Sequence, residues 1–204
     1  MMVGMVLAGT LLLSCHHREQ AAPINYKLIP FATEDGLFGY MEPDGDIAIE
    51  PQYEGAQVFA NGVACVCING EYGYISEEGM VVIPAIYEQG TSFSNNLAFV
   101  RVKQDHFICI DTDGRMKFEI TNCVAVRPFS EGMAPFCSVL GKWGYMNDKG
   151  EEVYIPTFDY AGDFHEGVAA VQMHGKWGMI DTEGEFVVEP IYSSLGFEEG
   201  KANE

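Results

Sequence analysis

Five histidines are the side chains in this sequence best suited to acid–base chemistry, but their spacing does not assemble a catalytic group. His16 and His17 are adjacent near the N-terminus, whereas His106 and His174 fall in polar stretches that read as turns. His165 stands in a segment where similar stretches of the chain have serine or glutamate. General-base and nucleophilic catalysis need a base, a nucleophile and an orienting partner held together. We therefore expect that the protein is not an enzyme.

Two loops come close to known functional motifs but have the wrong spacing. The stretch 111–114, "DTDG", has glycine at the fourth position. An EF-hand calcium loop needs it at the sixth, after carboxylates at positions one, three and five. The stretch 130–132, "SEG", lacks the G-x-S-x-G pattern of a hydrolase nucleophile. We predict structural turns at both places, with no metal and no cofactor.

The cysteines are not spaced as a metal or redox motif. Apart from Cys15, the sequence has five cysteines: Cys65, Cys67, Cys109, Cys123 and Cys137. None of them forms a C-x-x-C pair, which is the spacing typical of zinc and thiol–disulfide sites. Cys65 and Cys67 would share one face of a β-strand, because side chains alternate along a strand. We predict that these two are small buried residues; the sequence leaves the redox state of all five open.

The charge balance limits the classes of partner. The chain has 30 acidic and 11 basic residues and a formal net charge of -19. Phosphate backbones and anionic lipid surfaces would repel such a protein, so nucleic acid is excluded as a partner. The acidity could attract cations or a basic partner, or it could simply keep a solvated surface soluble.

The N-terminal residues differ in composition from the rest of the chain. Residues 1–13 are uncharged and mostly apolar, too few to cross a bilayer as a helix, and "LLSC" ends at Cys15. This ending resembles the lipobox of bacterial lipoprotein signal peptides, which implies a signal peptide over 1–14 and a lipid on Cys15. Residues 15–27 would then be a tether, and the protein would be lipid-anchored in the bacterial cell envelope. The alternative is an apolar tail with an incidental cysteine.

The remaining sequence repeats a pattern of glycines and aromatic residues. Glycines in polar turns recur at spacings of 34, 35, 36 and 34 residues: Gly45, Gly79, Gly114, Gly150 and Gly184. Seven residues before each of them stands an aromatic residue: Phe38, Tyr72, Phe107, Trp143 and Trp177. Glycine follows the aromatic residue in four copies, and a proline stands near the end of the next apolar run in the same four. The third copy has Ile108 and no proline, so it is the degenerate one.

A second set of columns repeats at the same period. Five phenylalanines each precede an alanine by five residues: Phe59, Phe93, Phe129, Phe164 and Phe197. Between them stands a glycine or asparagine, residues that tolerate a positive φ angle: Gly62, Asn96, Gly132, Gly167 and Gly200. Columns this regular indicate stacked structural units rather than a catalytic site.

The repeated residues resemble a known family. The run from Lys142 to Gly150, "KWGYMNDKG", and the run from Lys176 to Gly184, "KWGMIDTEG", resemble the WG (KWG) repeat found in tandem in bacterial proteins. The resemblance covers residues 28–204 and is poorest in the third copy. It implies an exported tandem β-repeat, and it carries no catalytic residues with it.

The local pattern predicts an all-β array of five repeats of about 35 residues. Each copy holds a hairpin and a third strand, and we expect a loop with a helical turn between them. Stacked copies should bury Trp143, Trp177 and Phe164 in a shared core. The sequence opens on a third-strand segment, where Pro30 and Phe31 correspond to Pro135 and Phe136. With three strands per copy and a short period, we predict an open superhelical array; the alternative is a closed propeller-like ring.

The function that fits this organisation is binding. Loops vary between copies while the frame is constant, which favours a membrane-anchored interaction module for an unknown protein, peptide or glycan partner. The residues that we expect on a partner-binding face are polar or aromatic and lack counterparts in every copy: Lys103, Gln104, Asp105, Tyr154, Phe158 and Tyr160. The alternative is a purely structural envelope spacer or assembly subunit.

Overall fold

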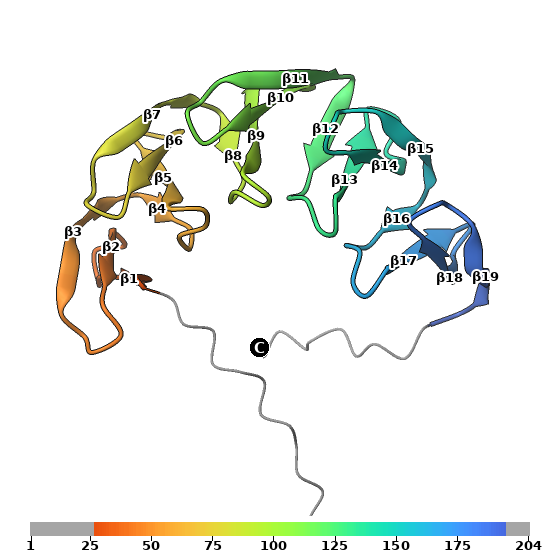
Figure 1. Ribbon diagram of the computed structural model, residues 1–204, viewed down its shortest axis with the longest axis horizontal. Helices are drawn as coiled ribbons and strands as arrows, with labels where there is room; N and C mark the ends of the chain where they lie inside the picture. The colour runs from red at the N-terminus through yellow and green to blue at the C-terminus, as the bar shows by residue number, and fades with distance from the viewer. Residues whose placement is uncertain (1–26, 195–204) are drawn as a thin grey trace, which may run out of the picture.

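The computed structural model describes residues 27–194, and every regular element in this part is a β-strand. The strands form five antiparallel sheets, A to E, set one after another along an arc (Figure 1). Sheet A consists of β1 (Ile29–Ala32), β2 (Phe38–Met41) and β3 (Ile47–Tyr53). Within the described residues, no helix is long and apolar enough to cross a membrane.

The other four sheets have four strands each. Sheet B contains β4 (Gly55–Ala56), β5 (Val63–Ile68), β6 (Glu71–Ser76) and β7 (Val81–Tyr87). Sheet C contains β8 (Gln89–Gly90), β9 (Leu97–Lys103), β10 (His106–Asp111) and β11 (Met116–Thr121). Sheet D contains β12 (Cys123–Val126), β13 (Met133–Ser138), β14 (Trp143–Asn147) and β15 (Glu152–Phe158). Sheet E contains β16 (Tyr160–Ala161), β17 (Val168–Met173), β18 (Lys176–Asp181) and β19 (Phe186–Tyr192).

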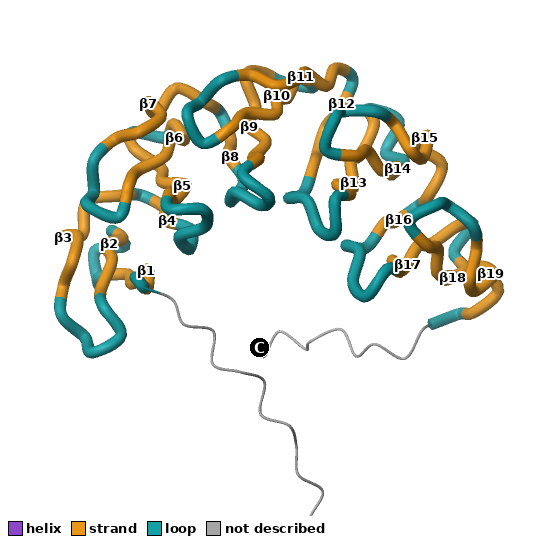
Figure 2. Tube along the Cα trace, viewed as in Figure 1, coloured by secondary structure: helices purple, strands orange, loops and turns teal. Residues whose placement is uncertain are grey.

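The all-β repeat architecture is therefore confirmed, but three strands per copy was wrong for sheets B to E. A short fourth strand follows one residue after the outer strand of the preceding sheet, as β4 follows β3. The chain thus runs from the outer edge of one sheet directly to the inner edge of the next. The loops after these inner strands, 57–62, 91–96, 127–132 and 162–167, lie on the concave side of the arc (Figure 2). They contain no helical turn.

Within the described residues, sheet A has three strands and no inner strand. Its β1 occupies the place of a third strand, as the sequence predicted. The predicted correspondence of Pro30 with Pro135 is also seen in the strand pairing. Pro30 lies opposite Tyr40, just as Pro135 lies opposite Tyr145. No strand of sheet A pairs with sheet E within residues 27–194.

The glycine after each aromatic residue makes room for a bulge in the outer strand. Trp143 pairs with Phe158 and Tyr145 pairs with Tyr154, so an advance of two residues along β14 corresponds to four residues along β15. The extra backbone bulges toward Gly144, where an added Cβ atom would lie 2.9 Å from the nitrogen of Pro156. Any larger residue would clash there, and the outer edge position tolerates the proline. The proline therefore lies at the bulge inside the strand rather than at its end.

The third copy shows why glycine and proline are lost together. Ile108 replaces the glycine, and β10 and β11 pair without that bulge, with Phe107 opposite Ile120 and Ile108 opposite Glu119. Without a bulge there is no backbone for a side chain at this position to meet. Strand β12, which follows, is also longer than its equivalents β4, β8 and β16.

Within residues 27–194, the core consists of four separate apolar clusters, one between each pair of neighbouring sheets. The cluster between D and E includes Tyr145, Phe158 and Phe164, all 3% exposed or less. Phe164 is buried as predicted, but Trp143 and Trp177 are only half-buried. The fully buried aromatic position is instead two residues further on, where Tyr40, Tyr74 and Tyr145 are 0% exposed.

Candidate binding site

The buried tyrosines join neighbouring sheets by a recurring hydrogen bond. Each hydroxyl donates to a backbone carbonyl in the concave loop of the next sheet: Tyr40 to Gln57 at 2.8 Å, Tyr74 to Thr91 at 2.8 Å and Tyr145 to Gly162 at 2.7 Å. Sheet C has Cys109 at this position, which is also 0% exposed but makes no such bond. The joint between sheets C and D therefore lacks this link.

The joint between sheets D and E carries a stacked cation at the inner edge. The Arg127 guanidinium lies 5.1 Å from the ring centre of Trp143 and 5.5 Å from that of Tyr160. One of its nitrogens donates to the carbonyl of Ala161, and its Nε lies 3.4 Å from the Asp163 carboxylate. A cation that lies over two aromatic rings is stabilised by both π faces, and here it bridges the two sheets.

Further polar side chains tie sheet D to sheet E. The Glu131 carboxylate accepts from the backbone N–H groups of Glu166 at 2.7 Å and Gly167 at 2.8 Å. Ser130 donates to the carbonyl of Phe164 at 2.6 Å. The Lys142 ammonium donates to Asp159, and this hydrogen bond holds the pKa of the Asp159 carboxyl below its ordinary value.

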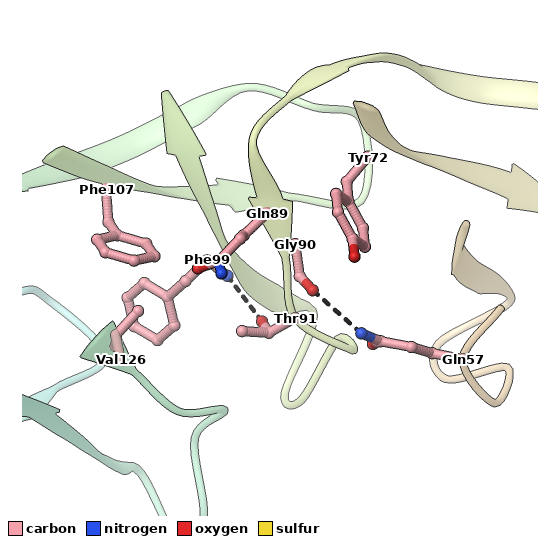
Figure 3. Close-up of a pocket in the computed structure, with 8 residues that line it drawn as sticks. All are labelled: Gln57, Tyr72, Gln89, Gly90, Thr91, Phe99, Phe107 and Val126. Atoms are coloured by element: carbon pink, nitrogen blue, oxygen red, sulfur yellow. Dashed lines mark hydrogen bonds between the residues drawn. The ribbon is translucent and has the colours of Figure 1, made fainter. Parts of the chain in front are cut away.

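A hollow of about 180 Å³ lies at the inner edge of sheet C, around β8 (Figure 3). Gln57 and Tyr72 line it from sheet B, Gln89, Gly90, Thr91, Phe99 and Phe107 from sheet C, and Val126 from sheet D. The Gln57 carboxamide donates to the carbonyl of Gly90 at 3.1 Å and accepts from the Ser92 hydroxyl at 2.7 Å. A cavity of about 150 Å³ is large enough for a benzene-sized group.

Where it borders sheet B, this hollow occupies the place that Arg127 fills at the joint between sheets D and E. Gln57 and Thr91 precede their loop phenylalanines by two residues, as Arg127 does. Tyr72 and Phe107 stand in the same column as Trp143, while Gln89 and Ala125 correspond to Tyr160. The Gln57–Gly90 hydrogen bond is the counterpart of the one from Arg127 to Ala161. Shorter side chains at these positions leave the space that arginine, tryptophan and tyrosine close between sheets D and E.

The six residues expected on a partner face lie in three places. Lys103 ends β9, and Gln104 and Asp105 form the turn that leads to β10; Lys103 and Gln104 are exposed. Tyr160 lies on β16, is 38% exposed and joins the Arg127 stack.

The other two expected residues belong to the core. Phe158 is 3% exposed and Tyr154 is half-buried, and their ring centres lie 6.0 Å apart in the cluster between sheets D and E. Phe158 therefore lies in the core and does not present its ring at the surface. The pattern of apolar and polar residues did not separate the surface position Tyr160 from the buried position two residues earlier.

The five cysteines of the described residues are free and buried, as predicted for Cys65 and Cys67. Burial raises the pKa of the Cys65 and Cys109 thiols to about 12 and that of Cys123 to about 11. The thiolate, which is the nucleophilic and metal-binding form, is therefore scarce at neutral pH. Residues 27–194 hold no group of three or more His, Cys, Asp or Glu side chains placed to bind a metal ion. Cys15 lies outside the described residues.

A family model for the WG-containing repeat matches residues 38–72, 72–104, 143–177 and 177–203. These segments cover more than half of the sequence, so the chain belongs to the WG-containing repeat family. The unmatched stretch between them contains the degenerate third copy. No curated protein matches the sequence.

Solved structures with a similar fold are β-propeller-like proteins. BamB from Moraxella catarrhalis is 13% identical with a TM-score of 0.50, over 80% of this chain and 58% of that one. Hsv2 from Kluyvelomyces marxianus is 10% identical with a TM-score of 0.53, over 80% of this chain and 69% of that one. The chain thus spans little more than half the length of BamB, and at these identities the likeness concerns the fold alone.

Proposed function

We propose that this WG-repeat chain is a membrane-anchored interaction module of the bacterial cell envelope. The observation that carries the proposal is the contrast between a constant frame and a varied concave edge. The tyrosine hydroxyl bond recurs at three of the four joints, and the loop phenylalanine is buried at three of them. The half-buried positions beside them change from glutamine to threonine to arginine. Variation on a fixed frame is typical of repeat proteins that bind partners along one surface.

We further propose that the array remains open rather than closing into a ring. A sheet of four strands fits an open array and a closed propeller equally well, so the number of strands per sheet does not separate the two forms. The short period and the separation of sheets A and E along the arc support the open form (Figure 1). Small-angle X-ray scattering of the full chain tests this, because a closed ring would give a narrower distribution of interatomic distances.

The proposed anchor is a lipid on Cys15, supported by the apolar run and the "LLSC" ending. Mass spectrometry of the envelope protein should find cleavage before Cys15 and an acylated thiol. A Cys15→Ser change should move the protein from the membrane fraction to the soluble fraction. An intact Met1 on the mature envelope protein would overturn the anchor without affecting the binding proposal.

The binding proposal is tested by cross-linked affinity capture with the tagged full chain in its own envelope. The matched variant replaces Lys103, Gln104 and Asp105, which lie in one turn, by Ser, Ser and Asn. These side chains are short and polar, and asparagine tolerates the positive φ of 58° at position 105. A stoichiometric partner that the variant loses, with an unchanged thermal transition, supports binding through this turn. Reproducible recovery of the chain without a partner favours the structural spacer instead.

A further inference from the structure

We propose that the hollow around β8 binds the guanidinium of an arginine side chain on a basic partner. The inference rests on the proposed binding function and names the chemistry of one site within it. Its basis is internal, because the same place at the joint between sheets D and E already holds an arginine side chain of this chain.

The contacts of Arg127 show which groups surround a guanidinium at the joint between sheets D and E. Its guanidinium is a planar cation that lies over Trp143 and Tyr160 and donates to the carbonyl of Ala161. At the joint between sheets B and C, Tyr72 supplies the ring in the place of Trp143 and Gly90 supplies the equivalent carbonyl, while Gln89 stands where Tyr160 stands. The ring of Phe107 lines the hollow from the cluster between sheets C and D. The cation is what differs, because Gln57 and Thr91 are neutral and shorter. A guanidinium from outside would find aromatic faces and carbonyl or carboxamide oxygens that match its flat shape and five donors.

The charge near the hollow does not oppose a cation. Arg101, opposite Gln89 in the pairing of β8 with β9, has its Nε 3.1 Å from the Glu88 carboxylate, so its charge is balanced locally. The chain as a whole carries a formal net charge of -19, which draws basic partners toward it. Lysine would gain the same long-range attraction. It would gain less inside the hollow, because its ammonium is compact and cannot stack as a plane.

The test uses the full chain, labelled with ¹⁵N, and three short peptides of the form acetyl-Gly-X-Gly-amide. The residue X is arginine, lysine or citrulline, and citrulline keeps the planar shape of arginine without its charge. The arginine peptide should shift the resonances of Gly90, Thr91 and the Gln57 carboxamide. We expect the citrulline peptide to bind roughly tenfold more weakly, as the loss of a cation–π contact implies.

Two sets of variants locate the site. Gln57→Arg supplies the cation from the chain itself, as Arg127 does between D and E, and should abolish the shifts at Gly90 and Thr91. If Gln57→Arg disturbs folding, the pair Tyr72→Phe and Tyr72→Leu replaces it, and binding should survive only with phenylalanine.

Two results would overturn the proposal. One is equal binding of the arginine and citrulline peptides. The other is a set of shifts spread over the acidic surface that persist in Gln57→Arg and Tyr72→Leu, which would mean general electrostatic attraction. Either result leaves the capture experiment and the turn at 103–105 untouched, so the failure of this site is distinguishable from failure of the binding function.

Discussion

The joint between sheets D and E and the joint between sheets C and D use the same apolar contact but differ in polar links. In both, a loop phenylalanine packs on an aromatic ring of the preceding sheet. The ring centres of Phe164 and Tyr145 lie 5.0 Å apart, and those of Phe129 and Phe99 lie 4.9 Å apart. Side-chain hydrogen bonds from Tyr145, Arg127, Ser130 and Glu131 cross the first joint. Across residues 27–194, no side-chain hydrogen bond joins sheet C to sheet D; Cys123 donates from its backbone to Asp105 at 3.3 Å.

The difference separates what stacks the sheets from what fixes them. Apolar burial is non-directional and brings both pairs of sheets together. Hydrogen bonds are directional, so they fix the angle and register of one sheet on the next. We infer that sheets A to C and sheets D and E behave as two stiffer parts joined at the third copy.

Removing the loop phenylalanine should lower the free energy of unfolding more than any other change, and by a similar amount at both joints. Phe164→Ala should lower the free energy of unfolding by about 3 to 5 kcal/mol, because the ring is 1% exposed and leaves a cavity. Phe129→Ala, at a ring that is 3% exposed, should lose a similar amount. Urea unfolding measures both, with Leu140→Ala as the surface control at 85% exposed. A much smaller loss for Phe129 would mean that the two joints also differ in packing.

Removing the tyrosine hydroxyl should affect only the joint that uses it. Tyr145→Phe leaves the carbonyl of Gly162 without its donor and should cost about 1 to 3 kcal/mol. Tyr154→Phe is the matched control, because its buried hydroxyl has no hydrogen-bond partner. That change should be neutral or slightly stabilising in the same urea assay. Equal losses for both variants would contradict the role given to the Tyr145–Gly162 bond.

Thiol labelling compares the joint between C and D with the joint between B and C. Cys109 and Cys65 are 0% and 1% exposed, and burial raises the pKa of both thiols to about 12. Opening at Cys65 must break the bonds of Tyr74 and Gln57, whereas opening at Cys109 breaks no such link. Cys109 should therefore react with a maleimide at least roughly tenfold faster under native conditions, as one or two lost bonds imply. Peptide mass spectrometry follows each cysteine separately, and equal rates would argue against a weak third copy.

The smallest effect is expected at the concave loops. Glu131→Gln keeps one of the two carboxylate oxygens that accept from Glu166 and Gly167. The cost should be below about 1 kcal/mol, because the bonds are exposed to water. Glu152→Gln is the control, since its side chain is exposed and its carboxylate makes no hydrogen bond in the described residues. Thermal unfolding of the two variants should differ in midpoint by a degree or two at most.

The frame of the fold could be predicted because the same residue types recur at the same positions of each copy. The turn glycines at 45, 79, 114, 150 and 184 do adopt positive φ angles, and so do Gly62, Asn96, Gly132 and Gly167. Each column reports one backbone requirement repeated at a fixed period, so a single sequence contains several independent observations of it. The weak third copy could be recognised for the same reason, since Ile108 departs from a column.

The inner strands and the binding hollow could not be predicted in this way. A strand of two residues, such as Gly55–Ala56, is too short to show any alternation of apolar and polar side chains. Trp143 and Tyr145 lie on one face of the same strand, so alternation does not say which of them is the more deeply buried. The Arg127 stack brings together residues 16 and 33 positions apart, and no column marks it, because the equivalent loop positions hold glutamine, threonine and glycine.

The direct passage from an outer strand to the next inner strand means that the repeat of the sequence and the unit of the fold are out of phase. Gly141 and Gly175 lie in the hairpin turns of corresponding strand pairs, each with a φ angle of 73°, and the turn that contains Gly141 is one residue longer. If residues 141–174 were deleted, Leu140 would precede Gly175 and β13 would form its hairpin with β18. The chain would then hold a complete sheet in the order β12, β13, β18 and β19. An array built in this way can gain or lose one period by recombination at matching turns and become longer or shorter by a whole sheet, without a broken sheet at the seam.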